Sequence, residues 1–219
     1  MQGLRAAIFD NDGTVSDTHD MILDSFRYST EKVLGEALPD EVLMAKVGIP
    51  LIDQMRDFSD DPEVVQQLMD AYHEDNLADH EKKVKRFPGT IEALERLRES
   101  GYRLAIATSK RHALAERGLG AIGVLEYFEV VVGCEDTERH KPDPDPVLEA
   151  AKRLGVGISE CAYIGDAAFD IRAAKAAGCT SIGVTWGMFG REVLEAEDPD
   201  YIVESYPELA DLLISIEAR

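Results

Sequence analysis

The chain has 219 residues, of which 45% are hydrophobic and 30% charged, an ordinary composition for a soluble globular protein with a sizeable core. Forty-three acidic residues against 23 basic ones give a formal net charge of −20, which argues against nucleic acid or an anionic membrane as a partner. No apolar run approaches the roughly 18 residues of a membrane span and no signal-peptide pattern opens the chain, so we expect a cytoplasmic protein.

The first predicted element is a short buried strand over residues 5–9, which ends on two acids, Asp10 and Asp12, before a glycine. Ligands of an open α/β sheet bind beyond the carboxyl ends of its strands, and side chains two residues apart face the same way. Two neighbouring carboxylates repel each other unless a cation or a shared proton intervenes, so the pair suggests a divalent metal. A solvated Asp-Gly turn is the alternative, whereas a calcium loop is excluded because its glycine position would fall on Val15.

The next stretch, from Thr18 to about Arg86, contains only helical patterns, broken by glycine and proline at residues 35, 39, 48–50 and 60–62. An all-helical insertion directly after the first strand predicts a molecule of two parts. We expect hinges at residues 15–17 and 87–89, a core formed by residues 1–16 and 87–219, and a helical domain at residues 17–86.

From Gly89 onward, apolar runs alternate with helical patterns, which is typical of successive βαβ units around a parallel sheet. We expect strands at residues 103–108, 128–132, 161–164, 180–184 and 201–203, and helices at residues 91–100, 112–122, 146–154, 169–177 and 209–216. The predicted fold class is therefore α/β, with a parallel sheet and an inserted helical domain.

Polar residues also follow later strands of the predicted sheet. These are Thr108, Ser109 and Lys110 after one strand, Lys141 in a proline-rich turn, and Asp166 and Asp170 at a helix start. Taken singly, the hydroxyls and acids could cap helices, and the lysine could be solvated. An acid pair, hydroxyls, an ammonium group and a second acid pair at successive strand ends instead indicate one shared site.

Phosphoryl transfer would use every one of these groups. A carboxylate can attack phosphorus to form an aspartyl-phosphate, and a second carboxyl group can move protons to the leaving oxygen and from water. Magnesium takes carboxylate and phosphate oxygens as ligands, while ammonium and hydroxyl groups hold the transferring phosphoryl oxygens. The three cysteines lack the close spacing of a zinc site. The sequence therefore favours a Mg²⁺-dependent phosphoryl-transfer enzyme.

These motifs resemble those of the haloacid dehalogenase (HAD) superfamily of aspartate-nucleophile hydrolases, and the resemblance covers essentially the whole chain. The four family motifs appear in order as Asp10-x-Asp12-Gly13-Thr14, Thr108-Ser109, Lys141-Pro142 and Gly165-Asp166-x-x-x-Asp170. The resemblance implies a Rossmann-like core with an inserted α-helical cap.

By motif position, the resemblance implies that Asp10 is the nucleophile and Asp12 the general acid/base. Thr108 and Ser109 would bind the phosphoryl group, and Lys141 would neutralise charge on the nucleophile and the phosphate. Magnesium would be bound by Asp10, the Asp12 backbone carbonyl and Asp166, with Asp170 as a further or supporting ligand. Two positions depart from the family pattern. We expect Asn11 to point away from both acids, and Ala167 to remove no catalytic group.

Asp12 favours a phosphoryl substrate, because dehalogenases of this superfamily attack carbon and do not need a second acid. A closer resemblance, to phosphoglycolate phosphatases and PpaX-like pyrophosphatases, is carried by residues 47–51, 72–76, 184–187 and 199–201. It implies inorganic pyrophosphate or phosphoglycolate as the substrate. Arg191, Lys110 and Arg111 could supply positive charge for a second phosphate or a carboxylate, with a solvated surface base as the alternative for each.

Three alternatives remain open at this point. A sugar-phosphate phosphatase or a β-phosphoglucomutase-like mutase would keep the same catalytic residues and differ in the substrate or in the phosphoryl acceptor. A phospho-acceptor signalling domain also combines Asp, Thr and Lys on a similar sheet, but Asp12 and the helical insertion argue against it. We expect a small phosphorylated metabolite or pyrophosphate as the partner, and a monomer or weak homodimer.

Overall fold

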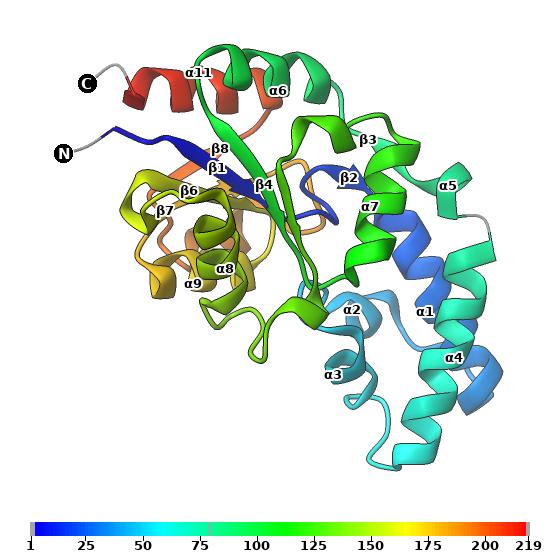
Figure 1. Cartoon of the computed structure of the whole chain (residues 1–219). Helices are drawn as coiled ribbons and strands as arrows, with labels where there is room; N and C mark the ends of the chain where they lie inside the picture. Colours follow the sequence, from blue (N-terminus) through cyan, green and yellow to red (C-terminus); the bar gives the residue numbers. More distant parts are fainter. Residues whose placement is uncertain (1–2, 79, 218–219) are drawn as a thin grey trace.

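A computed structural model describes residues 3–78 and 80–217 of the chain (Figure 1). Its centre is a six-stranded sheet in the order β5-β4-β1-β6-β7-β8, and every adjacent pair of these strands is parallel. The strands are β1 Ala6–Phe9, β4 Arg103–Ala107, β5 Val130–Val132, β6 Cys161–Gly165, β7 Thr180–Val184 and β8 Tyr201–Val203. The α/β class and the Rossmann-like parallel sheet are thereby confirmed.

The central strands are apolar along their whole length because helices cover both faces of the sheet. All four residues of β1 and all five of β6 are buried. One face packs against α6 Thr90–Glu99, α7 His112–Ala121 and α11 Tyr206–Glu217, and the other against α8 Asp145–Leu154 and α9 Ala168–Ala177. Alternate strand residues enter the two hydrophobic cores, so Ala7 and Phe9 lie on one face and Ala6 and Ile8 on the other.

A helical insert, defined here as helices α1–α5 between residues 19 and 83, lies beside the sheet (Figure 1). Its helices are α1 His19–Leu34, α2 Asp40–Met44, α3 Leu51–Met55, α4 Pro62–Ala78 and α5 His80–Lys83. The insert has its own hydrophobic core, in which the rings of Phe26 and Tyr72 lie 5.0 Å apart. Both ends of the insert lead into a short antiparallel pair, β2 Ser16–Asp17 and β3 Lys85–Arg86.

The predicted core elements agree with the observed ones to within about three residues at each end. The strand expected at residues 128–132 is shorter and covers Val130–Val132, and a 3₁₀ turn, Leu125–Tyr127, lies before it. Two further 3₁₀ turns, Cys134–Asp136 and Ile158–Glu160, and the short helix α10 Arg191–Glu195 were not predicted. The pair β2–β3 was also missed, since two-residue strands are too short to carry a hydrophobic period. None of the helices in the described part of the chain is long and apolar enough to cross a membrane.

Candidate active site

The site lies where the order of strands reverses. From β1 the chain adds β4 and β5 on one side of the sheet, and then returns to add β6, β7 and β8 on the other. The carboxyl end of β1 therefore stands at the topological switch point, where open α/β sheets bind ligands. Loops that leave β1, β4 and β6 at this edge carry Asp10, Thr108 and Asp166, respectively.

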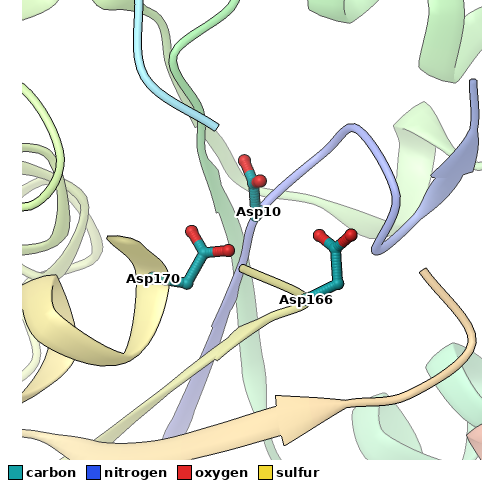
Figure 2. Close-up of side chains that lie close together, drawn as sticks. All are labelled: Asp10, Asp166 and Asp170. Atoms are coloured by element: carbon teal, nitrogen blue, oxygen red, sulfur yellow. The ribbon is translucent and has the colours of Figure 1, made fainter. Parts of the chain in front are cut away.

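Three carboxylates converge at this edge (Figure 2). Asp10 follows β1, Asp166 follows β6 and Asp170 stands in the first turn of α9, and one oxygen from each lies within 4.8 Å of the others. All three residues are at most 3% exposed. Burial and the charges of the other aspartates raise the pKa of Asp10 to about 8, and burial with the charge of Asp170 raises the pKa of Asp166 to about 7.

This cluster fits a divalent cation. Its donor atoms are all carboxylate oxygens, which are the ligands that a hard cation prefers. Three buried carboxylates repel one another, and a cation among them would offset that repulsion.

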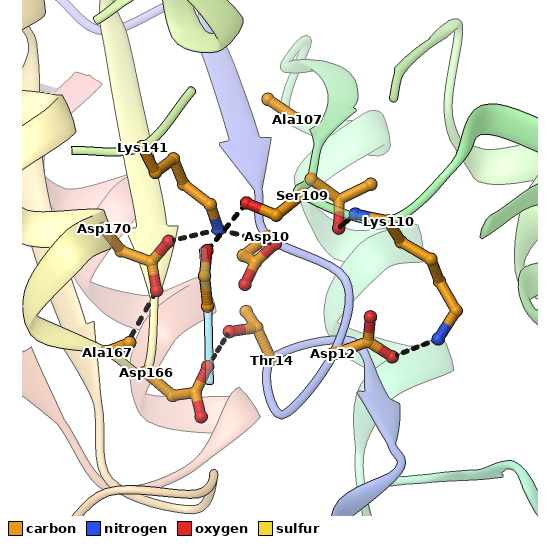
Figure 3. A network of polar contacts seen from close by, with 12 residues as sticks. Asp10, Asp12, Thr14, Ala107, Ser109, Lys110, Lys141, Asp166, Ala167 and Asp170 are labelled. Carbon is orange, nitrogen blue, oxygen red and sulfur yellow. Dashed lines mark hydrogen bonds and ion pairs between the residues drawn. The ribbon is translucent and has the colours of Figure 1, made fainter. Parts of the chain in front are cut away.

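The ammonium group of Lys141 provides a positive charge beside the three aspartates. Its Nζ lies 3.0 Å from Asp10 Oδ1 and donates a 2.7 Å hydrogen bond to Asp170 Oδ1 (Figure 3). Burial disfavours the ammonium form, but the charges of Asp10 and Asp170 outweigh it and hold the pKa of Lys141 above its usual value. The turn that carries Lys141 continues through a cis peptide bond to Pro142.

Asp166 is fixed in place from two loops. Its Oδ1 accepts a 3.0 Å hydrogen bond from the Thr14 hydroxyl, and its Oδ2 accepts a 2.6 Å bond from the Met188 backbone N–H. Gly13 approaches the same carboxylate so closely that a Cβ atom there would lie 2.2 Å from Asp166 Oδ2. Because Gly13 also has φ +77°, only glycine fits this position.

Asp12 lies in the same cavity but has different partners. Its Oδ1 accepts a 2.9 Å hydrogen bond from the Thr18 hydroxyl. The same oxygen accepts a 2.7 Å bond from Lys110 Nζ (Figure 3). Burial favours the neutral acid, yet Lys110 and these hydrogen bonds hold the pKa of Asp12 below its usual value. The carboxylate is therefore ionised and available to accept a proton.

Asn11 is buried and, unlike Asp10 and Asp12, does not line the cavity, so its expected orientation away from both acids stays a prediction. Its Oδ1 accepts a 2.9 Å bond from the Ser16 hydroxyl. Its backbone carbonyl also accepts hydrogen bonds from Val15 and Ser16, so Asn11 organises the turn that carries the acids.

The hydroxyls after β4 have separate environments. Thr108 is 2% exposed, lines the cavity, and its Oγ1 accepts a bond from the Lys110 backbone N–H. The Ser109 hydroxyl instead donates a 2.7 Å hydrogen bond to the Gly48 carbonyl of the helical insert. This bond joins the insert directly to the catalytic edge of the sheet.

The cavity has a volume of about 210 Å³ and two unlike walls. The sheet edge contributes Asp10, Asp12, Asp166 and Lys141, so this wall is charged. The opposite wall comes from the insert and is mostly apolar, with residues Ile22, Phe26, Val47, Ile49, Leu51, Ile52 and Met69. The cavity therefore presents charged groups on one side and apolar side chains on the other.

Arg191 is the one candidate site residue that the structure places elsewhere. It begins α10, has an exposed side chain, and pairs with Glu204 at 2.6 Å and Glu195 at 3.4 Å. Arg191 does not line the cavity, so the expectation that it binds the substrate is wrong. The residues that sequence reasoning missed, Thr18 and Met188, act through long-range contacts that carry no local pattern.

Comparisons with known proteins agree with this geometry. The family model described as haloacid dehalogenase-like hydrolase matches residues 7–184. The chain belongs to the haloacid dehalogenase-like hydrolases. The chain is therefore a hydrolase, and the residues at the sheet edge form its candidate active site.

Two curated relatives of this hydrolase cover almost its whole length. "Putative pyrophosphatase PpaX" of Caldanaerobacter subterraneus subsp. tengcongensis is 39% identical over 96% of this chain and 94% of that protein. "Pyrophosphatase PpaX" of Halalkalibacterium halodurans is 33% identical over 99% of both chains. A crystal structure of a predicted phosphatase from Clostridium acetobutylicum superposes with a TM-score of 0.87 at 28% identity, covering 97% of this chain and 99% of that one.

The contact between Ser109 and Gly48 gives a first testable expectation. Gly48 has φ +114°, and a Cβ atom there would lie 3.3 Å from the Ala167 Cβ. Gly48→Ala should strain this loop by about 1–3 kcal/mol and lower kcat roughly tenfold or more, because the insert no longer seats against the sheet edge. Steady-state kinetics provides the measurement, with circular dichroism to verify folding.

Gly120→Ala is the matched control for this substitution. Gly120 lies on α7 with an ordinary φ, and nothing lies within 4 Å of a Cβ atom built there. It should retain wild-type kcat. A Gly48→Ala enzyme with the same kcat as Gly120→Ala would show that the loop contact plays no part in turnover.

Proposed function

We propose that this hydrolase is a Mg²⁺-dependent phosphatase that uses Asp10 as the nucleophile, with inorganic pyrophosphate as its substrate. The observation that carries the proposal is the position of Asp10. Its Oδ1 lies 3.0 Å from the buried Lys141 Nζ, and the side chain is clustered with two further buried aspartates. An anionic phosphoryl group reaches such a carboxylate only when its charge is neutralised from several sides.

In the first step, an Asp10 oxygen attacks phosphorus, and the bond from phosphorus to the leaving oxygen breaks. The leaving group takes the bonding electron pair, and Asp10 becomes an aspartyl-phosphate. Lys141 balances the charge on Asp10, and the Thr108 hydroxyl donates to a phosphoryl oxygen. An alkoxide leaving group must be protonated as it departs, whereas phosphate departs as a stable anion. Because Asp12 beside Lys110 is ionised and has no proton to donate, it suits phosphate better than an alkoxide as the leaving group.

In the second step, water attacks the phosphorus of the aspartyl-phosphate. Asp12 accepts the proton from this water, the bond from phosphorus to Asp10 breaks, and phosphate is released with the Asp10 carboxylate restored. Thr18 and Lys110 hold the Asp12 side chain for this task.

Residues Asp10, Asp166 and Asp170, with the Asp12 backbone carbonyl, would hold the cation. Bound there, Mg²⁺ would neutralise charge on the phosphoryl oxygens. Thr14 and Met188 orient Asp166 toward the cluster, and Lys141 orients Asp170.

We also propose that residues 17–86 form a cap over a core of residues 1–16 and 87–219. The strands β2 and β3 pair at the junction, and Ser109 contacts Gly48 across it. A cap that closes over the cavity would exclude bulk water while the aspartyl-phosphate exists.

Pyrophosphate is preferred because both PpaX relatives carry that name and because Lys110 places a cation beside the proton-transfer residue. A second candidate is a phosphate monoester with a small organic group, which the apolar wall of the insert favours. Measuring phosphate release from pyrophosphate, phosphoglycolate and a sugar phosphate separates the two. We expect the highest kcat/KM for pyrophosphate. A preference for an organic monoester by tenfold or more would replace pyrophosphate with the second candidate.

A further inference from the structure

Arg111 is unusual among the arginines of this acidic protein. Eleven arginines of the described structure form ion pairs with acids or hydrogen bonds to backbone carbonyls, and Arg98 donates to a carbonyl and stacks on Tyr127. The Arg111 backbone carbonyl accepts hydrogen bonds from Leu114 and Ala115, but its side chain has neither an ion pair nor a hydrogen bond among the described residues. With 43 acidic residues in the chain, an arginine without such a partner calls for a specific explanation.

Arg111 also lines the active-site cavity. It is the N-cap residue of α7, directly after Lys110, and its side chain is exposed at the cavity wall. Two other basic side chains, Lys110 and Lys141, line this cavity in the described structure, and both already pair with aspartates. Among the described residues that line the cavity, Arg111 is therefore the cation whose charge is available to a bound anion.

The neighbours of Arg111 do not satisfy it. Glu135 is near enough for Arg111 to lower its pKa, but its Oε2 accepts bonds from the His112 backbone N–H and from Cys134. His73 of α4 lines the cavity as well, and burial lowers its pKa, with the charge of Arg111 acting in the same direction. A neutral His73, with Nδ1 3.3 Å from the Met69 carbonyl, adds no competing cation.

We propose that Arg111 is the specificity residue that binds an anionic leaving group, either the second phosphate of pyrophosphate or a carboxylate of similar reach. This inference rests on the proposed phosphatase function and deepens it. Asp10 attacks one phosphorus at the sheet edge, and Arg111 on the next loop holds the charge at the other end of the substrate. A guanidinium group matches phosphate and carboxylate oxygens with two parallel N–H donors.

The test compares an anionic with an uncharged leaving group. Arg111→Gln should raise KM for pyrophosphate about 10–100-fold, the equivalent of one lost charge-assisted contact, with kcat changed much less. With p-nitrophenyl phosphate, whose leaving group carries no second anion, kcat/KM should stay within about twofold of wild type. Arg111→Lys should recover part of the pyrophosphate KM, because it keeps the charge and loses the two-pronged geometry.

Arg56→Gln is the matched control, because it removes the same charge from an exposed arginine that does not line the cavity. It should leave KM for both substrates unchanged. The inference would be overturned if Arg111→Gln lowered kcat/KM equally for pyrophosphate and p-nitrophenyl phosphate, or lowered it for neither. Calorimetric titration of pyrophosphate into Asp10→Asn and Asp10→Asn/Arg111→Gln proteins tests binding without turnover. Weaker pyrophosphate binding in the double variant than in Asp10→Asn would support Arg111 as the anion-binding residue. Failure of the wild type to hydrolyse either substrate would refute the proposed function and leave this binding result standing.

Discussion

Asp10→Asn should lower phosphate release at least ~10⁴-fold, because the amide cannot attack phosphorus and no other carboxylate occupies its position. The neighbouring Asp166 is bound to Thr14 and Met188, and Asp170 is bound to Lys141. The measurement is single-turnover phosphate release at saturating pyrophosphate. Trapping of ³²P on wild-type protein after acid quench, and its absence from the variant, would identify the covalent intermediate directly.

The same variant should fold at least as well as the metal-free wild type. Folding raises the pKa of Asp10 from an ordinary value near 4 to about 8, so the folded state binds a proton that the unfolded state releases. The metal-free wild type therefore loses stability as pH rises from about 4 to about 8. Asn resembles the neutral acid and removes this contribution. Between pH 5 and pH 8, urea unfolding should accordingly show a smaller loss of unfolding free energy for Asp10→Asn than for the wild type.

Residual turnover of Asp10→Asn above ~1% of the wild-type rate would contradict the assignment of Asp10 as the nucleophile.

Removal of divalent metal should abolish activity, and the affinity for Mg²⁺ should depend steeply on pH. Burial and mutual repulsion raise the pKa of Asp10 to about 8 and of Asp166 to about 7, so Mg²⁺ must displace protons to bind. Between pH 8 and pH 6 the apparent affinity should fall about tenfold or more per pH unit. Isothermal titration calorimetry in buffers of different ionisation enthalpy measures both the affinity and the protons released.

A thermal-unfolding series with and without Mg²⁺ gives an independent readout. Mg²⁺ that binds only the folded state should raise the midpoint, by an amount that grows from pH 6 to pH 8. Asp166→Asn should lose most of this rise, whereas Lys152→Gln, a change at an exposed lysine of α8, should retain it. Full activity in excess chelator, or stronger Mg²⁺ binding at pH 6 than at pH 8, would rule out the carboxylate cluster as the metal site.

Much of the core could be predicted because its signals are local. The apolar run before Asp10 and the run before Asp166 are each buried on both faces, so they are readable without knowledge of their neighbours. Glycines at residues 155 and 178 end helices α8 and α9 in the left-handed conformation, as their position after an amphipathic run predicts. The alternation of such elements was enough to predict a parallel sheet.

Partners within the site could not be predicted, because they join residues far apart in the chain. Asp12 and Lys110 are 98 residues apart, and Thr14 and Asp166 are 152 apart. The local hydrophobic pattern of a sequence carries no information about hydrogen bonds between residues so far apart.

By itself, the sequence determined the chemistry: the acids, the hydroxyl and the lysine that a phosphoryl-transfer site needs stand at successive strand ends. Tertiary structure alone decided how these groups are used. It placed Lys110 against Asp12, joined Ser109 to Gly48 and paired Arg191 with surface glutamates. It also left the Arg111 side chain at the cavity wall without an ion pair among the described residues. The reason is physical, since residue type and strand position follow from local pattern, whereas charge pairing and cavity shape depend on which surfaces pack together.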